Sequence, residues 1–499
     1  MSRSLLTTCL IALLTTLVCS CGEPALPVAP GESVIVRLPE GSWEAKGSLA
    51  DIRNVVLISI DALGAKHTGA YGYERNTTPN LDRFASEGTL FVYAYAQQMH
   101  TLSSHLTMMT GLYPQAHGAS VDRVASRKAI TLAQILKQHG FTTAAFTGKV
   151  GYAGPRFGLG RGIDLYRTGS GDAVEENGPR FKWLEAQARA RAEDPDHRFF
   201  LFAHFYDVHS DFKTEVPYYA PPPYGLKFLP GGLDWEYRGD STLLQEIYKS
   251  GKVTEHDKQI LAALYDGGVL YCDERGVGPL LQKLHALDFD DDTLVIITAD
   301  HGEELFEHGE GIHQQSYEVT SRVPLVFRGP GIPRGLRLPY LAELVDLMPT
   351  ILSLLSLPAP EYVEGDDLNP LFFGEKPATQ VARVDGNRKD NETFKSNLIV
   401  EREGIRWSYM NRIIAAPEGE GTGFVLKDKG ELYNLDRDPD QSVNLARYHR
   451  SLAGELETAL LAWYTETDAL GRKLGGSAKG TAVISEEAKQ RLRGLGYVQ

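Results

Sequence analysis

Continuous apolar runs recur along the first two thirds of the chain, with segments of helical spacing between them. The runs are rich in β-branched and aromatic side chains, which is typical of strands buried on both faces. Four such runs lie at Val55–Ile60, Phe141–Lys149, Arg198–His209 and Thr293–Glu304. Helical patterns at Leu81–Gly88 and Thr131–Gly140 separate them. Strands that alternate with helices predict an α/β fold with a largely parallel central sheet.

The pattern changes after about Gly365. Short strand-like pieces follow, and a helical pattern extends from about Leu445 to Ala469. We therefore expect one large domain over residues 51–365 and a smaller α+β subdomain with a tail over residues 366–499.

The N-terminus has the layout of an export signal. One arginine precedes an apolar stretch from Leu5 to Val18, and small residues follow, so residues 1–20 are predicted to form a signal peptide. The end of this stretch resembles a bacterial lipobox, which implies a lipid anchor on Cys21, a tether over residues 21–50, and a periplasmic or cell-surface bacterial lipoprotein. The alternative is an ordinary cleaved signal with an incidental cysteine.

Composition narrows the function classes. The 499 residues carry a formal charge of −14, which argues against a nucleic-acid partner because such proteins usually present a basic face. Of four cysteines, only Cys272 would remain unmodified in a mature chain, so neither a disulfide framework nor a cysteine-based metal site is expected. Cys272 is predicted to be a small buried hydrophobe.

Polar side chains follow the predicted strands where each ends. They are Asp61, Lys149, Asp207 with His209, and Asp300 with His301. In α/β sheets, ligands bind outside the carboxyl ends of strands, so these side chains are expected to meet. Two carboxylates and an imidazole suit a divalent cation, and a cation can activate an alcohol.

The alcohol could come from the segment HTLSSH at residues 100–105. Thr101, Ser103 and Ser104 precede an apolar run, where hydroxyl residues commonly cap helices. The local sequence alone does not separate a nucleophile from a cap.

Several motifs in sequence order resemble the sulfatase family of the alkaline-phosphatase-like superfamily. They are NVVLISIDALGAKHTGAYGYERNTTPNLDRFASEGTLF from Asn54, TGLYPQAHG from Thr110, ITADHGEELFEHGEG from Ile297, YEVTSRVPLVFRGPG from Tyr317, LAELVDLMPTILSLLSLP from Leu341, and ELYNLDRDPDQSVNL from Glu431. The resemblance implies a mixed central sheet flanked by helices, with a C-terminal subdomain and a divalent metal beneath the nucleophile.

The resemblance also assigns roles. The metal ligands fall on Asp61, Thr101, Asp300 and His301, and substrate-binding positions fall on Lys149 and His105. His209 and His313 occupy positions where an imidazole could bind substrate oxygens, donate a proton to the leaving group, or hold a second metal. Zn or Mn are favoured, and Ca or Mg are also permitted by this ligand set.

The nucleophile position departs from the family pattern. Sulfatases carry Cys or Ser in Cys-x-Pro-x-Arg nine residues before TGLYP, and that residue is oxidised to formylglycine. Here the position is Thr101, which cannot give the aldehyde, and His105 stands where the family has Arg. The segment is similar instead to Thr-Leu-Pro-Ser-His in sulfatase-like proteins and, more distantly, to phosphoethanolamine transferases. Thr101 is thus the predicted nucleophile, and Ser103 and Ser104 are predicted to cap the helix.

These features predict a metal-dependent hydrolase that forms a covalent Thr101 intermediate. On chemical grounds phosphate or phosphonate esters are favoured over sulfate esters, although the resemblance points to sulfatases. The substrate could be a glycan, a lipid or a small molecule. Two alternatives remain open: a phosphoethanolamine-type headgroup transferase, and a non-catalytic surface binding protein on a sulfatase scaffold. The Tyr- and Pro-rich loop at residues 211–240 is expected to line the mouth of the site.

Overall fold

The computed structural model describes residues 47–120, 123–148, 151–210, 218, 220–229, 252–309, 311–377, 380–386, 388–389, 392–393, 395–416 and 424–475. The predicted signal peptide, Cys21 and most of the tether lie outside these residues, as do Lys149 and most of the 211–240 loop. Among the described helices, none is long and apolar enough to span a bilayer.

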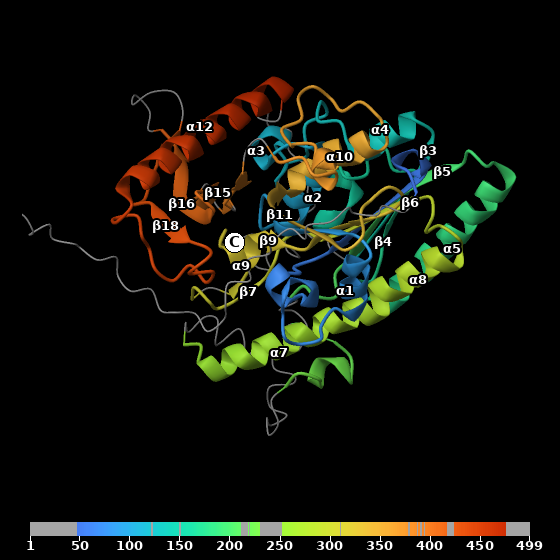
Figure 1. Cartoon of the computed structure of the whole chain (residues 1–499), viewed down its shortest axis with the longest axis horizontal. Helices are drawn as coiled ribbons and strands as arrows, with labels where there is room; N and C mark the ends of the chain where they lie inside the picture. The colour runs from blue at the N-terminus through green and yellow to red at the C-terminus, as the bar shows by residue number, and fades with distance from the viewer. Residues whose placement is uncertain are drawn as a thin grey trace, which may run out of the picture.

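A mixed sheet of nine strands forms the centre of the molecule (Figure 1). Along its main path the strands are β11 (Leu336–Glu343), β2 (Thr89–Tyr95), β10 (Leu325–Arg328), β6 (Thr293–Ala299), β1 (Asn54–Ile60), β5 (Arg198–Phe205), β3 (Phe141–Thr147) and β4 (Leu165–Thr168), and β9 (Arg322–Val323) pairs with β2. From β6 to β4 all neighbours are parallel, whereas β10 runs antiparallel to β6 and β2. The predicted α/β fold is confirmed. The sheet is mixed because β10 and β9 return in the opposite direction.

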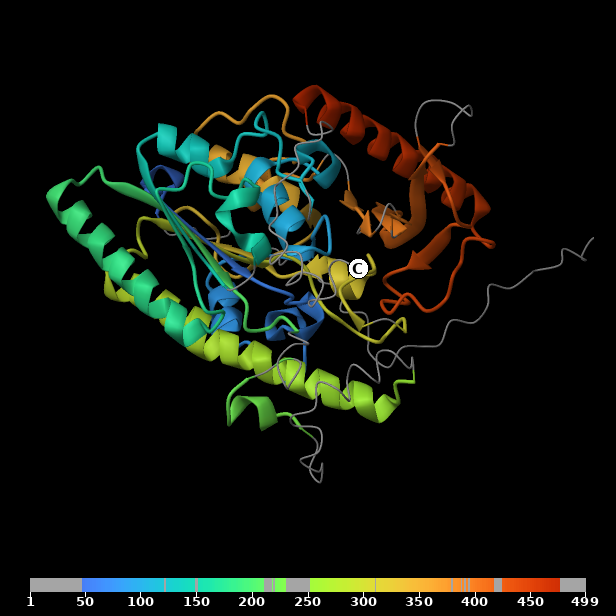
Figure 2. The same ribbon diagram turned by 180° about the vertical axis from the view of Figure 1, so that it is seen from behind.

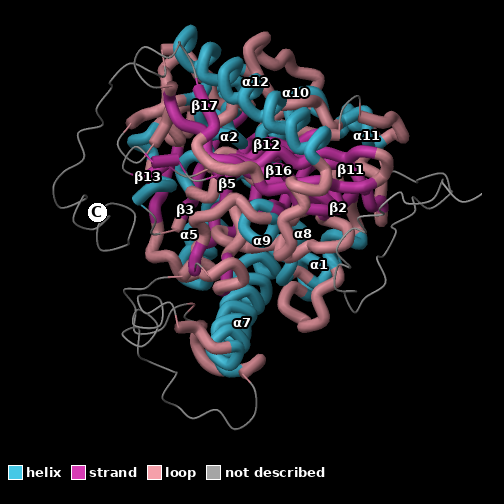
Figure 3. The backbone as a smooth tube through the Cα atoms, turned by 90° about the vertical axis from the view of Figure 1, so that its left-hand side faces the viewer, coloured by secondary structure: helices cyan, strands magenta, loops and turns pink. Residues whose placement is uncertain are grey.

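Helices cover both faces of the sheet (Figures 1 and 3). One row contains α5 (Ala173–Glu193), α7 (Glu255–Tyr271), α8 (Gly278–Ala286) and α1 (Pro79–Ser86), and a π-helical turn at Cys272–Val277 joins α7 to α8. The opposite face carries α2 (Thr101–Thr110), α3 (Pro114–His117), α4 (Leu132–Gln138) and α10 (Leu347–Leu354). All seven residues of β1 are buried, which explains why five of them are Val, Leu or Ile.

The C-terminal part forms a second sheet beside the first, seen from behind in Figure 2. Its antiparallel strands are β12 (Val381–Val384), β15 (Lys395–Arg402), β16 (Ile405–Ala415), β17 (Phe424–Leu426) and β18 (Glu431–Asn434). Helix α12 (Arg450–Leu474) packs Leu460 and Tyr464 against this sheet, within the same core cluster as Tyr409. The helix begins five residues later than its apolar pattern predicts, because residues 445–449 form a turn.

Short elements complete the described chain. They are α9 (Glu318–Ser321), α11 (Asn369–Phe372), β7 (Glu304–Leu305), β8 (Gly311–Ile312), β13 (Arg388–Lys389) and β14 (Glu392–Thr393). Cys272 is a free thiol with 1% of its surface exposed, as predicted.

Strand register places the site. Ile60 of β1 pairs with Ala299 of β6 on one side and with Phe205 of β5 on the other. The residues that follow these strand ends are therefore neighbours, although nearly 240 residues separate Asp61 from Asp300 along the chain. Side chains alternate across a strand, so Ser59 and its partner His204 point to the same face as Asp61.

Candidate active site and metal centre

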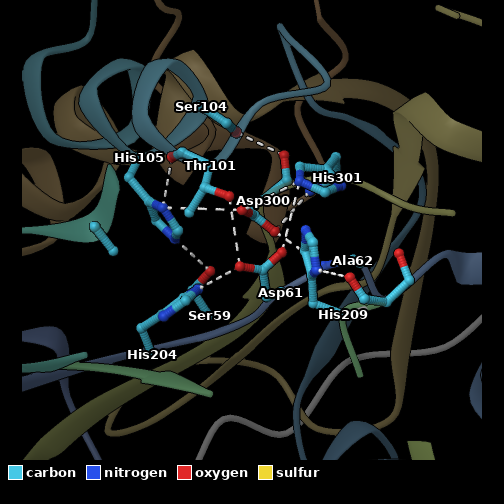
Figure 4. A network of polar contacts seen from close by, with 12 residues as sticks. Ser59, Asp61, Ala62, Thr101, Ser104, His105, His204, His209, Asp300 and His301 are labelled. Carbon is cyan, nitrogen blue, oxygen red and sulfur yellow. Dashed lines mark hydrogen bonds and ion pairs between the residues drawn. The ribbon is translucent and has the colours of Figure 1, made fainter. Parts of the chain in front are cut away.

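The predicted site residues gather where β1 and β6 end and α2 begins (Figure 4). Asp61 follows β1, Asp300 and His301 follow β6, and Thr101 is the first residue of α2. All four are buried, with Thr101 3% exposed and the other three fully enclosed. Two carboxylates, an imidazole and a hydroxyl from distant parts of the sequence are thus buried close together.

Helix α2 is held in place by polar side chains of its first turns. The Ser104 hydroxyl donates to the backbone carbonyl of Asp300 at 2.6 Å. The His105 ring contacts the Thr101 carbonyl through Nδ1 at 2.7 Å and the Ser59 hydroxyl through Nε2 at 2.8 Å. The helix is therefore tied to both β1 and β6, and its N-terminus is aimed at the strand ends.

The predicted capping role of Ser103 and Ser104 is wrong. The helix begins at Thr101 with His100 as N-cap, so both serines lie inside the first turn. Because the helix begins three residues earlier than capping by Ser103 would require, Ser104 is free to turn towards β6 instead. The physical reason is tertiary: the strand end offers a buried carbonyl that needs a donor.

The Thr101 hydroxyl lies 3.5 Å from Asp61 Oδ2, to which it donates. Thr101 also stands at the N-terminus of a helix ten residues long. Free N–H groups and the helix dipole make such an end favourable for negative charge. Charge that develops on the oxygens of a substrate bound at Thr101 would therefore be stabilised.

Three buried side-chain atoms of these four residues have no hydrogen-bond partner: Asp61 Oδ1, Asp300 Oδ2 and His301 Nε2. His301 Nε2 lies 3.6 Å from Asp61 Oδ1 and 3.5 Å from Asp300 Oδ2. Buried polar atoms are almost always paired, so three orphans that face one another indicate a missing common partner. A divalent cation fits, since carboxylate oxygens, an imidazole nitrogen and the Thr101 hydroxyl are a suitable donor set.

The electrostatics agree with this fit. Burial raises the pKa of Asp61 above its ordinary value, although His209, His301 and the Thr101 hydroxyl oppose the rise. A carboxylate that is costly to ionise in the protein alone is readily ionised beside a cation. The Asp300 carboxylate is already oriented, because Oδ1 accepts from the backbone N–H groups of Ala62 and His301 at 3.1 and 3.0 Å.

A cluster of imidazoles borders this centre. The His313 ring stacks on His301 with centroids 4.2 Å apart, and the His209 ring lies 5.0 Å from His313 and 6.4 Å from His301. His313 Nδ1 lies 3.3 Å from the carboxylate of Glu303, which also accepts from the Tyr218 hydroxyl. Burial lowers the pKa of both His209 and His313, so both rings favour the neutral form.

Two residues predicted to lie at the site, His105 and Asp207, make hydrogen bonds with other protein groups. His105 is fully buried, and both of its ring nitrogens contact protein atoms, so a substrate contact would require it to release Ser59 or the Thr101 carbonyl. Asp207 lies apart from the centre: its Oδ1 accepts from the first N–H of α5 at Ala173, 2.8 Å away. Ala62, directly after Asp61, adopts a left-handed φ of 58° that non-glycine residues rarely adopt.

Sequence reasoning missed two buried histidines. His204, within β5, has its Nε2 atom 3.2 Å from Asp61 Oδ2. His100 is buried against Tyr152, and its pKa is lowered to about 3, first by burial and then by His301 and His209. The sequence signal for His204 was a titratable residue inside the otherwise apolar run FFLFAHF. Such a residue has no role in a core unless it is paired. Glu303 was also missed as the partner of His313.

Comparison with known proteins gives a consistent result. The family model described as Sulfatase matches residues 53–357. Arylsulfatase K of Rattus norvegicus is 25% identical over 479 residues, covering 86% of this chain and 82% of that protein. An arylsulfatase of Clostridium perfringens is 24% identical, covering 81% and 94%. The solved phosphonate monoester hydrolase from Silicibacter pomeroyi superposes with a TM-score of 0.63 at 18% identity, covering 83% of this chain and 96% of its own.

Proposed function

We propose, from the premise that the chain belongs to the sulfatase family, that it cleaves phosphate or phosphonate esters through a covalent intermediate on Thr101. The chain is a sulfatase-family hydrolase that acts on ester bonds. The main support for Thr101 as the nucleophile is that its hydroxyl lies at a helix N-terminus and 3.5 Å from a buried carboxylate oxygen of Asp61.

Thr101 would supply the attacking oxygen. Asp61 Oδ2 accepts its hydrogen bond and would help to orient the oxygen. A divalent cation held by Asp61, Thr101, Asp300 and His301 would lower the pKa of the hydroxyl and neutralise charge on the substrate oxygens. Zn or Mn match this mixed oxygen and nitrogen set better than Ca or Mg, which prefer oxygen alone.

His209 and His313 are proposed to contact the ester and carry protons. Both are buried beside His301, and neutral imidazoles can accept hydrogen bonds or a proton. We propose that His313, oriented by Glu303, accepts the proton of the water that releases the product from Thr101. His209, whose Nδ1 contacts the Ser210 carbonyl at 2.6 Å, would accept the Thr101 hydroxyl proton on Nε2 and pass it to the leaving oxygen.

The chemistry of the intermediate favours phosphorus over sulfur. A threonine phosphate can be cleaved by water at phosphorus, which regenerates the hydroxyl. A threonine sulfate lacks the hemiacetal-type release that an aldehyde-derived residue provides. The similarity to a phosphonate monoester hydrolase supports the same substrate class at the level of the fold.

The decisive experiment compares purified wild type with Thr101→Ala on matched aryl sulfate, phosphate monoester, phosphate diester and phosphonate substrates, each with Zn, Mn, Ca or Mg. Thr110→Ala, at the other end of α2, is the matched control. We expect phospho-ester turnover that falls at least about 10³-fold in Thr101→Ala and little in Thr110→Ala. Rapid quenching and mass spectrometry of the wild type should show a phosphorylated Thr101.

Three other outcomes of this experiment would change the proposal. Sulfate turnover that depends on Thr101 would overturn the preference for phosphorus. Turnover only when a lipid or glycan acceptor is added would favour the headgroup transferase. Phospho-ester turnover that survives in Thr101→Ala would remove Thr101 as the nucleophile.

A further inference from the structure

The two oxygens of the Asp61 carboxylate face different imidazoles (Figure 4). Oδ1 lies 3.6 Å from His301 Nε2, whereas Oδ2 lies 3.2 Å from His204 Nε2. His301 comes from the loop after β6 and His204 from within β5, on the other side of β1. The carboxylate therefore stands between two nitrogen donors that approach from opposite strands.

His204 is buried without being satisfied. It has no exposed surface, and neither ring nitrogen has a hydrogen-bond partner. Its approach to Asp61 lacks the geometry of a hydrogen bond despite the short distance. Leaving both nitrogens of an imidazole without a hydrogen bond in a protein interior costs free energy.

The 3.2 Å distance between His204 Nε2 and Asp61 Oδ2 suits two ligands of one cation. Ligand atoms about 2.0–2.2 Å from a zinc ion lie roughly 3–3.5 Å from one another. Asp300 supplies a second carboxylate oxygen, since Oδ2 lies 4.0 Å from His105 Nδ1 and 3.5 Å from His301 Nε2. His105 and His204 cross edge to face with centroids 4.8 Å apart.

The described residues thus contain two overlapping ligand groups. One is Asp61, Asp300 and His301; the other is His105, His204 and Asp300, and within each group the ligand atoms lie within 4.8 Å of one another. Asp300 belongs to both groups, and Asp61 Oδ2 borders the second.

We propose that His204, Asp61 Oδ2 and Asp300 Oδ2 form a second divalent-cation position on the strand side of Asp61, so that the centre holds two cations with carboxylates between them. His105 becomes its fourth ligand when Nδ1 exchanges the Thr101 carbonyl for the ion. The imidazole-rich set selects Zn or Mn over Ca or Mg. This position does not depend on which ester the protein cleaves.

Metal stoichiometry tests the proposal without any substrate. The full chain is stripped with chelator, dialysed against Zn, and its bound Zn is measured by mass spectrometry. We expect two equivalents in the wild type, one in His204→Gln, and two in the control His285→Gln, an exposed histidine on α8. One equivalent in the wild type would overturn the second position, even if His204→Gln bound that ion more weakly.

A second readout needs no variant. Two Mn ions bridged by carboxylates give a spin-coupled electron paramagnetic resonance spectrum, whereas a single Mn gives the isolated six-line signal. We expect the coupled spectrum in the Mn-loaded wild type. An uncoupled signal at saturating Mn would refute the proposal even if His204→Gln failed to fold.

Discussion

The hydroxyl of Ser104 donates a 2.6 Å hydrogen bond to the backbone carbonyl of Asp300. One bond thereby joins the helix that presents Thr101 to the strand end that presents Asp300, a candidate metal ligand. Both residues are fully buried, so water cannot replace the contact. The distance between the candidate nucleophile and the candidate cation is set in part by this bond.

Ser104→Ala should therefore impair both stability and activity. Because the Asp300 carbonyl would lose its buried donor, the free energy of unfolding should fall by about 1–3 kcal/mol. Turnover should fall about tenfold as α2 loosens from β6. Chemical denaturation and steady-state kinetics measure the two effects, with Ser103→Ala in the same turn as control. Equal losses in both variants would argue against the special role of the bond.

Glu303→Gln should lower turnover about 10- to 100-fold, because the carboxylate that faces His313 Nδ1 at 3.3 Å would no longer fix that ring. Tyr218→Phe removes the other contact of the same carboxylate and should cost much less. The values of kcat and KM for both variants give the comparison. A larger effect from Tyr218→Phe would show that Glu303 serves packing instead of His313.

Metal removal should destabilise the protein. Without a cation, Asp61 Oδ1, Asp300 Oδ2 and His301 Nε2 stay buried and unpaired. Restoring a cation at 100 times its dissociation constant should add about 2.7 kcal/mol to the free energy of unfolding. Thermal denaturation after chelation, with Zn, Mn, Ca or Mg returned in turn, should show larger rises in Tm for Zn and Mn. Identical curves with and without chelator, once bound metal is shown to be absent, would contradict a metal centre.

Asp207→Asn should change how stability depends on pH. Burial raises the pKa of Asp207 from 3.8 to about 7. Between these values the unfolded chain loses the proton while the folded protein keeps it. The contribution of Asp207 to the free energy of unfolding is therefore fully present below about pH 4 and is lost as the pH rises to 7.

An asparagine stays neutral throughout. Relative to wild type, the variant should gain up to about 4 kcal/mol in unfolding free energy between pH 4 and pH 8. Urea denaturation across that range provides the measurement. Asp196→Asn, at an exposed carboxylate just before the start of β5, is the control. Parallel pH profiles for wild type and Asp207→Asn would mean that Asp207 is ionised in the folded protein.

The sequence by itself determined the strands and the residues that end them. Unbroken apolar runs predict buried strands because only a sheet covered on both faces hides every side chain. Asp61, Asp300 and His301 stand out because a titratable residue directly after such a run is rarely buried without a partner. Thr101 was identified as the candidate nucleophile because it lies nine residues before the motif TGLYP.

Only the tertiary structure decided what surrounds these residues. The pairing of Ile60 with both Ala299 and Phe205 brings the strand ends together and turns His204 towards Asp61. Ser104 was predicted to be a cap because local pattern shows the nearest backbone N–H groups and not a carbonyl almost 200 residues away. Such long-range contacts depend on sheet register and helix placement, and both are determined by packing throughout the core. They cannot be obtained from neighbouring residues along the chain.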